Sequence, residues 1–237
     1  MTRPRIWIAA ALLAAVLIIA TLPLRLVLGM AGAGDAGLTA RAVTGSLWSG
    51  QLIDARWRGA RLGSIGAGLA PLALLRGEVR LEIARDDVLL GKLTGALLLN
   101  GARGVKDMNG SVSLGASLAG VPLDSLQLAG VAARFDSAGR CVEAAGQARL
   151  SIALPVPGLD LANGMAGPLT CRDGRAEAAL ASQSGMERLT LAFDGAGQYR
   201  ARLSVRASGD AAAEGLLRAA GFLPAGGDLV LLHEGRL

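Results

Sequence analysis

Two hydrophobic patterns divide this chain. Residues 6–24 form an unbroken apolar run without a charged side chain. After residue 37 the chain instead alternates apolar and polar residues in short stretches that glycines separate. An unbroken run of this length is typical of a membrane-spanning helix, whereas alternation with a period of two is typical of half-buried β-strands. The sequence therefore predicts an anchored β protein.

The apolar run is long enough to cross a bilayer. At ~1.5 Å per residue it would span ~28 Å as a helix, which is close to the hydrocarbon thickness. Arg3 and Arg5 precede the run, so the positive-inside tendency keeps the N-terminus cytoplasmic and exports the remainder. We expect a cytoplasmic N-terminus and transmembrane anchor over residues 1–28, a flexible linker of small residues over 29–37, and an exported β domain over 38–237.

Two other interpretations of the apolar run are open. A cleaved signal peptide normally has a shorter apolar core, and the nearest small-residue cleavage site, Ala31-Gly32-Ala33, lies well beyond the run. A buried core helix would need a polar face, which this run does not have. The anchor and the signal peptide both export the body of the protein.

The body alternates like a series of antiparallel strands. Near its start, Ile53, Ala55 and Trp57 are predicted to share one face of a strand. The clearest hairpin joins residues 188–193 to residues 199–206 through a glycine-containing turn. We predict a mainly β fold, a long, curved antiparallel meander of roughly a dozen strands, preceded by the single N-terminal transmembrane helix.

Two short helices interrupt the strand pattern. Residues 71–75 begin with a proline and are followed by Gly77. Residues 210–220 begin with Asp210, a suitable N-cap, and end before Gly221, a suitable C-terminal glycine.

The charge of the body does not indicate nucleic-acid binding. The formal net charge is +5, but Arg3, Arg5 and Arg25 belong to the anchor region, which leaves 21 basic against 19 acidic residues in the body. The arginines are scattered along the strands without a basic run or interleaved aromatic residues. We therefore expect no nucleic-acid partner.

No set of residues predicts catalysis or metal binding. His233 is the only histidine, and it lies near the C-terminus beside Glu234. Asp86 and Asp87 are adjacent, so on a strand they would point to opposite faces. Residues 63–68 are glycine-rich but lack the lysine of a phosphate-binding loop. We expect no catalytic residues, cofactor or metal, and a protein that is not an enzyme.

The two cysteines are predicted to form a disulfide. Cys141 and Cys171 both lie in the exported body, where disulfides persist, and only one pairing exists. Two separate buried thiols are the alternative.

Trp48 and Trp57 are candidate partner contacts, because tryptophan is enriched at interfaces. Packing in the core of a sheet with few other aromatic residues is the alternative. Gly45 and Gly50 flank Trp48 and indicate a bulge or tight bend there.

An ordered set of short motifs resembles a known family. In chain order they are V-T-G-S-L-W-S-G at residues 43–50, A-R-W-R at 55–58, L-A-P-L-A-L-L-R-G at 69–77, Cys141 followed by Gly146, G-P-L-T-C-R-D-G at 167–174, and a helix ending at Gly221-Phe222. Together with the anchor, they resemble the type II secretion system protein N family of Gram-negative inner-membrane proteins. The resemblance implies an accessory role in a machine that exports folded proteins. The family has no known catalytic residues that could be assigned to positions of this sequence.

The favoured hypothesis is a single-pass inner-membrane protein with a periplasmic body that binds other secretion subunits. Partners would pair with an open sheet edge or contact the apolar face. The alternative is a periplasmic lipid-binding or lipid-transfer protein, which would need a large unfilled apolar groove. An anchored hydrolase is disfavoured by the missing catalytic set.

Overall fold

The structure is a computed structural model. It describes residues 7, 14, 17–18, 20–30, 32–34, 37–57, 60–100, 103–118, 121–152, 161, 163–207 and 209–236. Most of the predicted anchor lies outside these residues. Within the part of the chain that is described, no helix is long and apolar enough to span a membrane. The anchor and its topology stay predictions.

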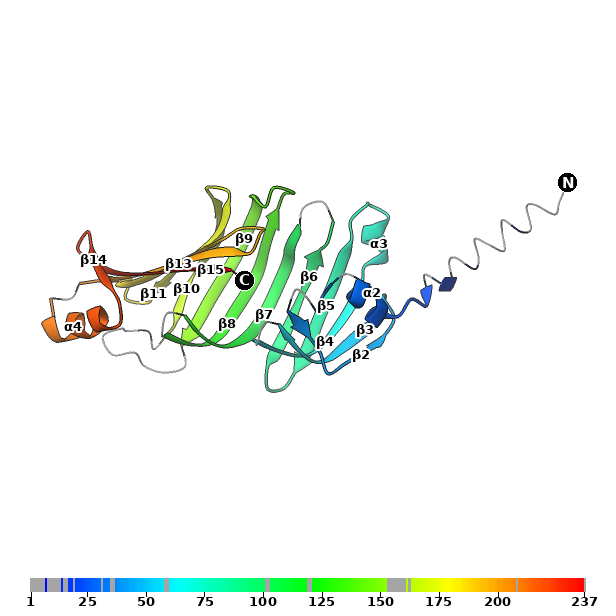
Figure 1. Cartoon of the computed structure of the whole chain (residues 1–237), viewed down its shortest axis with the longest axis horizontal. Helices are drawn as coiled ribbons and strands as arrows, with labels where there is room; N and C mark the ends of the chain where they lie inside the picture. The colour runs from blue at the N-terminus through cyan, green and yellow to red at the C-terminus, as the bar shows by residue number, and fades with distance from the viewer. Residues whose placement is uncertain are drawn as a thin grey trace.

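The described residues form a single antiparallel sheet of fifteen strands (Figure 1). The strands are β1 (Leu38–Thr39), β2 (Ala42–Gly45), β3 (Gly50–Trp57), β4 (Ala60–Leu69), β5 (Arg80–Asp87), β6 (Gly91–Leu98), β7 (Arg103–Leu118), β8 (Val121–Phe135), β9 (Cys141–Ile152), β10 (Met165–Arg172), β11 (Arg175–Ser182), β12 (Glu187–Phe193), β13 (Gln198–Arg206), β14 (Leu223–Ala225) and β15 (Asp228–Arg236). Strands β3 to β13 pair in sequence order, whereas β1 and β2 both pair with β3, and β14 lies outside β15. The predicted antiparallel meander is confirmed.

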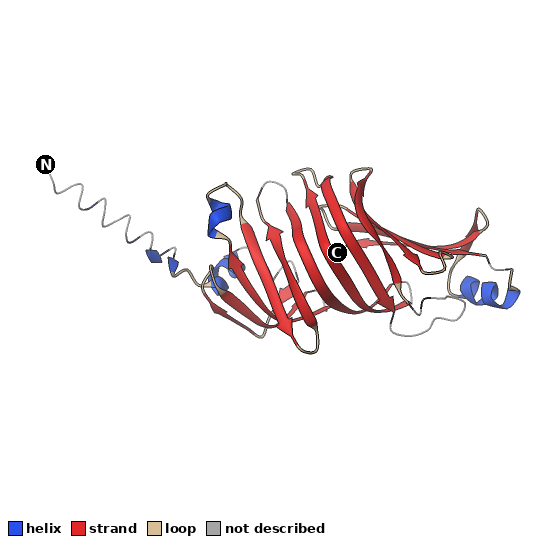
Figure 2. Ribbon diagram, turned by 180° about the vertical axis from the view of Figure 1, so that it is seen from behind, coloured by secondary structure: helices blue, strands red, loops and turns tan. Residues whose placement is uncertain are grey.

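Short helices lie at the two ends of the curved sheet (Figure 2). Helices α2 (Leu24–Met30) and α3 (Pro71–Leu74) lie near the first strands, and α4 (Ala211–Ala219) lies at the opposite end. The positions of α3 and α4 agree with the prediction. The Asp210 side chain accepts hydrogen bonds from two amides of the first turn of α4, as an N-cap should.

The C-terminal half of the sheet rolls over on itself. At one end, the turn between β8 and β9 meets the turn between β12 and β13. The Gly195 amide donates to the Gly139 carbonyl at 2.9 Å, and the ring centroids of Phe135 and Phe193 lie 5.9 Å apart. Strand twist makes such rolling possible, because it accumulates across a long sheet. The roll encloses the larger apolar core.

The core follows the alternation of the strands. In β13, Ala201, Leu203 and Val205 are buried, and Leu203 pairs with Leu189 of β12. The larger cluster extends from β6 to β15, and a smaller one lies on β3 and β4. The predicted hairpin of β12 and β13 is confirmed, both in its position in the chain and in which side chains face the core.

The predicted alternation is wrong in β3. Leu52 and Ala55 are buried there, whereas Trp57 is 42% exposed. The register shifts between Leu52 and Ala55, where Asp54 has a φ of 50°. A β-bulge at this point adds one residue between the two buried positions, so the side chains beyond it change faces. Ile53, Ala55 and Trp57 therefore do not share one face.

Helix α2 was not predicted as a separate element. Leu24 is only 1% exposed and packs with Leu52, Ala55 and other side chains of β3 and β4. Gly50 makes this contact possible, because a side chain at that position would overlap Leu24. The end of the apolar run is thus part of the packed body.

Replacing Gly167 by alanine is expected to destabilise the protein by about 1–3 kcal/mol, the usual cost of overpacking. A Cβ atom at Gly167 of β10 would overlap the carbonyl oxygen of Ala179 on β11. Gly215→Ala in α4 is the matched control, because its Cβ would meet nothing within 4 Å. The control should stabilise the protein by about 0.5–1 kcal/mol, as expected for glycine in a helix. Urea unfolding would measure both, and equal effects would contradict the close approach of β10 to β11.

Candidate interaction surfaces

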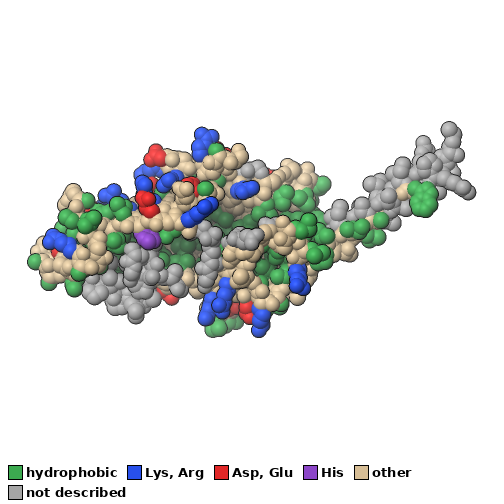
Figure 3. Space-filling model, viewed as in Figure 1, with side chains coloured by type: hydrophobic (Ala, Val, Ile, Leu, Met, Phe, Trp, Pro, Cys, Tyr) green, Lys and Arg blue, Asp and Glu red, His purple; other side chains and the backbone are tan. Residues whose placement is uncertain are grey.

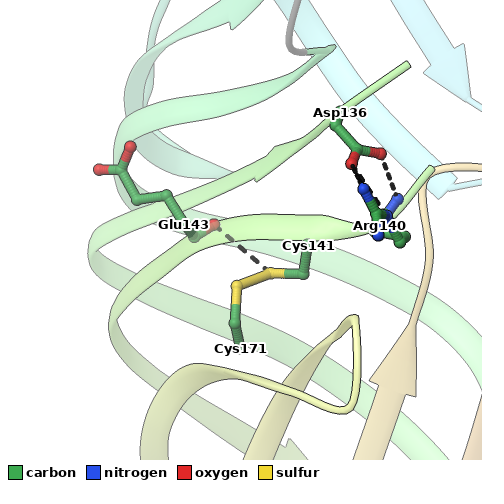
Figure 4. The surroundings of a disulfide bond; sticks show 5 residues. All are labelled: Asp136, Arg140, Cys141, Glu143 and Cys171. Atoms are coloured by element: carbon green, nitrogen blue, oxygen red, sulfur yellow. Dashed lines mark hydrogen bonds and ion pairs between the residues drawn. A yellow bond between two sulfur atoms is a disulfide. The ribbon is translucent and has the colours of Figure 1, made fainter. Parts of the chain in front are cut away.

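A disulfide joins β9 to β10 beyond the end of their ladder (Figure 4). Cys141 and Cys171 are bonded, with their Cα atoms 5.7 Å apart. The β9–β10 ladder ends at the pair of Pro168 with Gln147, and proline has no amide hydrogen to continue it. The disulfide holds the two strands together where the ladder stops. The predicted pairing is confirmed.

The turn before Cys141 is organised by one carboxylate. Asp136 accepts hydrogen bonds from the amides of Ala138 and Arg140 at 3.0 and 2.9 Å, and its other oxygen lies 2.9 Å from the Arg140 guanidinium (Figure 4). The bond from the Arg140 amide is the main reason that the pKa of Asp136 is lowered. Asp87 is similar, because bonds from the amides of Leu90 and Leu89 lower its pKa.

The stability of the body is expected to fall in acid because of these two carboxylates. A carboxyl group with a lowered folded-state pKa stabilises the fold above its unfolded pKa of ~3.9 and loses that contribution as the pH falls through the folded pKa. The double variant Asp87→Asn, Asp136→Asn should therefore show a weaker decline of the unfolding midpoint between about pH 5 and pH 2. Parallel pH slopes for the variant and the wild type would contradict this assignment.

Trp48 lies in the tight turn between β2 and β3. Gly45 pairs with Gly50, and the Ser46 amide donates to the Ser49 carbonyl at 3.2 Å. Gly45 has a φ of +81°, which favours glycine. The predicted bend at Trp48 is therefore confirmed.

The backbone beside Trp48 is fixed on both sides. The Leu47 amide donates to the Leu22 carbonyl at 2.8 Å, and the Leu47 carbonyl accepts from the Leu69 amide at 2.9 Å. The half-buried Trp48 lines a surface groove of about 500 Å³ with residues of β4, β5 and α3. Trp48 is thus held at the wall of an open groove, and its contact with a partner stays a prediction.

Trp57 does not share this groove. It lies at the other end of β3 from the Trp48 turn, where it pairs with Leu38 of β1. An eight-residue strand separates the two sites by ~23 Å at ~3.3 Å per residue. The two tryptophans therefore belong to different surfaces, and the role of Trp57 as a contact also stays a prediction.

An apolar cleft lies inside the C-terminal roll. Leucines and other apolar side chains of β8, β9, β10, β12, β13 and β15 line it and leave a cavity of only about 20 Å³. Leu231 and His233 of β15 lie at this cleft, and Figure 3 shows apolar side chains in the hollow of the molecule. In the part of the roll that the structure describes, side chains fill most of the interior.

The residues weighed for chemistry are not brought together. His233 lies 6.0 Å from Tyr199, between ring centroids. Asp86 lies 3.6 Å from Lys92, and Asp87 caps the following turn. Residues 63–68 lie within strand β4, not in a loop. Among the described residues, no group of three metal-ligating side chains is present.

A buried arginine was missed by the sequence analysis. Arg85 of β5 is 3% exposed and donates to four carbonyls. These are the carbonyls of Leu62 at 2.8 Å, Leu90 at 2.8 Å, Gly91 at 3.1 Å, and Ser111. Burial lowers the pKa of Arg85, and nearby Asp87 opposes that shift. Arg85 connects β4, the β5–β6 turn and β7, so its role is structural.

A buried carboxylate is likewise held within the fold. Glu187 is 3% exposed and accepts hydrogen bonds from the hydroxyls of Ser182 at 2.6 Å and Ser184 at 3.0 Å. These contacts close the turn between β11 and β12.

The fold and these surfaces define a single-sheet, disulfide-linked β protein with open strand edges. A family model, type II secretion system protein N, matches residues 36–230. The chain therefore belongs to the type II secretion system protein N family, as its motifs indicated, and is a component of that machinery. No curated protein and no solved structure matches it.

Proposed function

We propose that this chain is an inner-membrane-anchored, periplasmic accessory subunit of the type II secretion system that acts by binding other subunits. The family supports the pathway. The apolar run at residues 6–24 and the arginines before it support the anchor and the orientation. The disulfide agrees with an oxidising compartment.

The open edges of the sheet support a role in binding. A meander that does not close leaves strand edges at both of its ends, and such edges pair with extended segments of other proteins. Arg85 and Glu187, the conspicuous buried charges, are hydrogen-bonded within the fold. A role in binding explains the open edges and the internally bonded charges, and it requires no catalysed reaction.

The apolar cleft favours this proposal over lipid transfer. A lipid carrier needs room for acyl chains, whereas the cleft in the roll leaves about 20 Å³, enough for about one or two water molecules. The lipid hypothesis would gain support if lipid were recovered with the purified chain.

Deleting the gene and restoring it tests the proposed function. The secreted substrates of the machine should accumulate in the periplasm of the deletion strain, and the full chain should restore their release. A phosphatase fused after Leu237 should be active, and detergent should be needed to extract the chain. Unchanged secretion would contradict the proposed role, and release by carbonate alone would contradict the anchor.

A further inference from the structure

We infer that the outer edge of β15, residues 231–236, is the docking strand for an extended segment of a partner protein. This inference rests on the proposed function and assigns the binding site. The segment would add to the sheet as a new strand, with apolar side chains toward the cleft and acidic side chains outward.

The edge is long, regular and uncovered by the described residues. Strand β13 pairs with all of β15, from Asp228 to Arg236. On the other side, β14 pairs only with Asp228, Leu229 and Val230. Six residues thus offer ~20 Å of strand edge without a described partner. Unpaired backbone groups along such an edge are a template for another strand.

Other edges of the sheet are blunted. The first edge is divided between β1 and β2, with an interruption at Ala40–Arg41, and β14 contains Pro224. Proteins protect edges with prolines, lysines, bulges or short strands. Residues 231–236 contain no proline or lysine, and their pairing with β13 has no register shift. The charged side chains of this stretch are Glu234 and Arg236, and it has no proline, lysine or bulge.

The inward face selects apolar side chains. Half-buried Leu231 and exposed His233 lie opposite Leu203 and Ala201 of β13, and all four line the apolar cleft. In an added strand, every second side chain would lie beside them. Strand addition obtains specificity from such sites for alternate side chains.

The outward face selects acidic side chains. Leu232, which is 59% exposed, lies beside Arg202, and Arg236 ends the strand. Glu234 is already paired with Arg200 at 2.6 Å. A surface groove here is lined by Arg175, Arg200 and Arg236 with Glu234 as its single acidic residue. Figure 3 shows basic side chains along β13 and β15.

A second copy of this chain fits the edge poorly. Two copies of the chain could pair their β15 edges in antiparallel orientation. If five residues of each edge pair and the same face of both strands points to the same side, two registers are possible. One places Glu234 opposite Glu234, and the other places His233 opposite His233. Like charges directly opposite each other are destabilising, which disfavours the Glu234 register. In neither register does Arg236 lie opposite an acidic residue, so the basic groove is better matched by an acidic segment of a different protein.

Photo-cross-linking in intact cells tests the site. Benzoylphenylalanine would replace Leu232, Glu234 or Arg236, one at a time, in the full chain, with exposed Val142 of β9 as the control position. The expected result is capture of one segment of a secretion subunit. When the probe is moved by two residues along β15, the cross-linked residue of the partner should also change by two residues. That stepwise register is the signature of strand pairing.

An extension that occupies the edge provides the second test. An Asn-Gly turn and a six-residue strand of alternating threonine and valine would follow Arg236 in place of Leu237. The extension should abolish the cross-links from Leu232 and impair secretion. The same extension with prolines at alternate positions cannot pair with β15, because proline has no amide hydrogen. It should leave the cross-links from Leu232 and secretion unchanged.

Four outcomes would overturn the inference. These are capture without stepwise register, capture of a second copy, capture of lipid, and undiminished cross-linking with the edge occupied. If the wild-type chain still isolates with secretion subunits, only the assignment of the edge fails. If it isolates with none of them, the proposed function fails as well.

Discussion

Removing the disulfide by Cys141→Ser with Cys171→Ser should lower the free energy of unfolding by roughly 3–4 kcal/mol. The bond closes a loop across a sequence separation of 30 residues, and that constraint raises the free energy of the unfolded chain. It also holds β9 to β10 where Pro168 ends the ladder. Chemical unfolding followed by circular dichroism would measure the loss.

The single variants provide the control for the disulfide. Because both cysteines contribute to one bond, Cys141→Ser and Cys171→Ser should each lose nearly as much stability as the double variant. Losses that add up, or a double variant as stable as the wild type, would contradict a disulfide that stabilises the fold.

Replacing the buried arginine, Arg85→Met, should destabilise the body by about 3–5 kcal/mol. The variant keeps an apolar side chain of similar length but leaves the carbonyls of Leu62, Leu90 and other residues without their donor. Buried acceptors that lose their partners cost free energy because water does not replace the bond.

The matched control for Arg85 is Arg56→Met on the exposed side of β3. Surface substitutions of this kind usually change stability by less than about 0.5 kcal/mol. Urea midpoints of the two variants should therefore differ clearly. Similar midpoints would show that the hydrogen bonds of Arg85 do not hold β4, β5 and β7 together.

Local patterns predicted the strands whose facing is regular. In β12 and β13, every second residue is buried or packs inward, so period-two alternation located both strands and their turn. Helix α4 was found from Asp210 and Gly221, because capping residues act within a single turn. In each case the deciding contacts lie close together in sequence.

Long-range contacts were not predictable in this way. The roll depends on Phe135 meeting Phe193 and on Gly139 meeting Gly195, and neither pair leaves a local pattern. The bulge at Asp54 places Ile53 and Ala55 on different faces, and a second register shift between Ala55 and Arg56 precedes exposed Trp57. Arg85 resembled an outward-facing strand residue, because its burial depends on carbonyls from neighbouring strands.

The full length of β15 is a similar case. Residues 233–236 have little intrinsic strand propensity, so no local pattern marks them as strand. The structure extends β15 to Arg236, since β13 pairs with it along its whole length. The cysteine pairing was predictable, because two cysteines in an exported body allow only one bond.

Isolation of the full chain from detergent-solubilised envelopes tests whether it binds other secretion subunits. The chain would carry an affinity tag, and proteins enriched over an untagged strain would be quantified by mass spectrometry together with co-isolated lipids. We expect enrichment of other type II secretion subunits in amounts comparable to the chain itself. Recovery of the chain with lipid but without any secretion subunit would contradict that expectation.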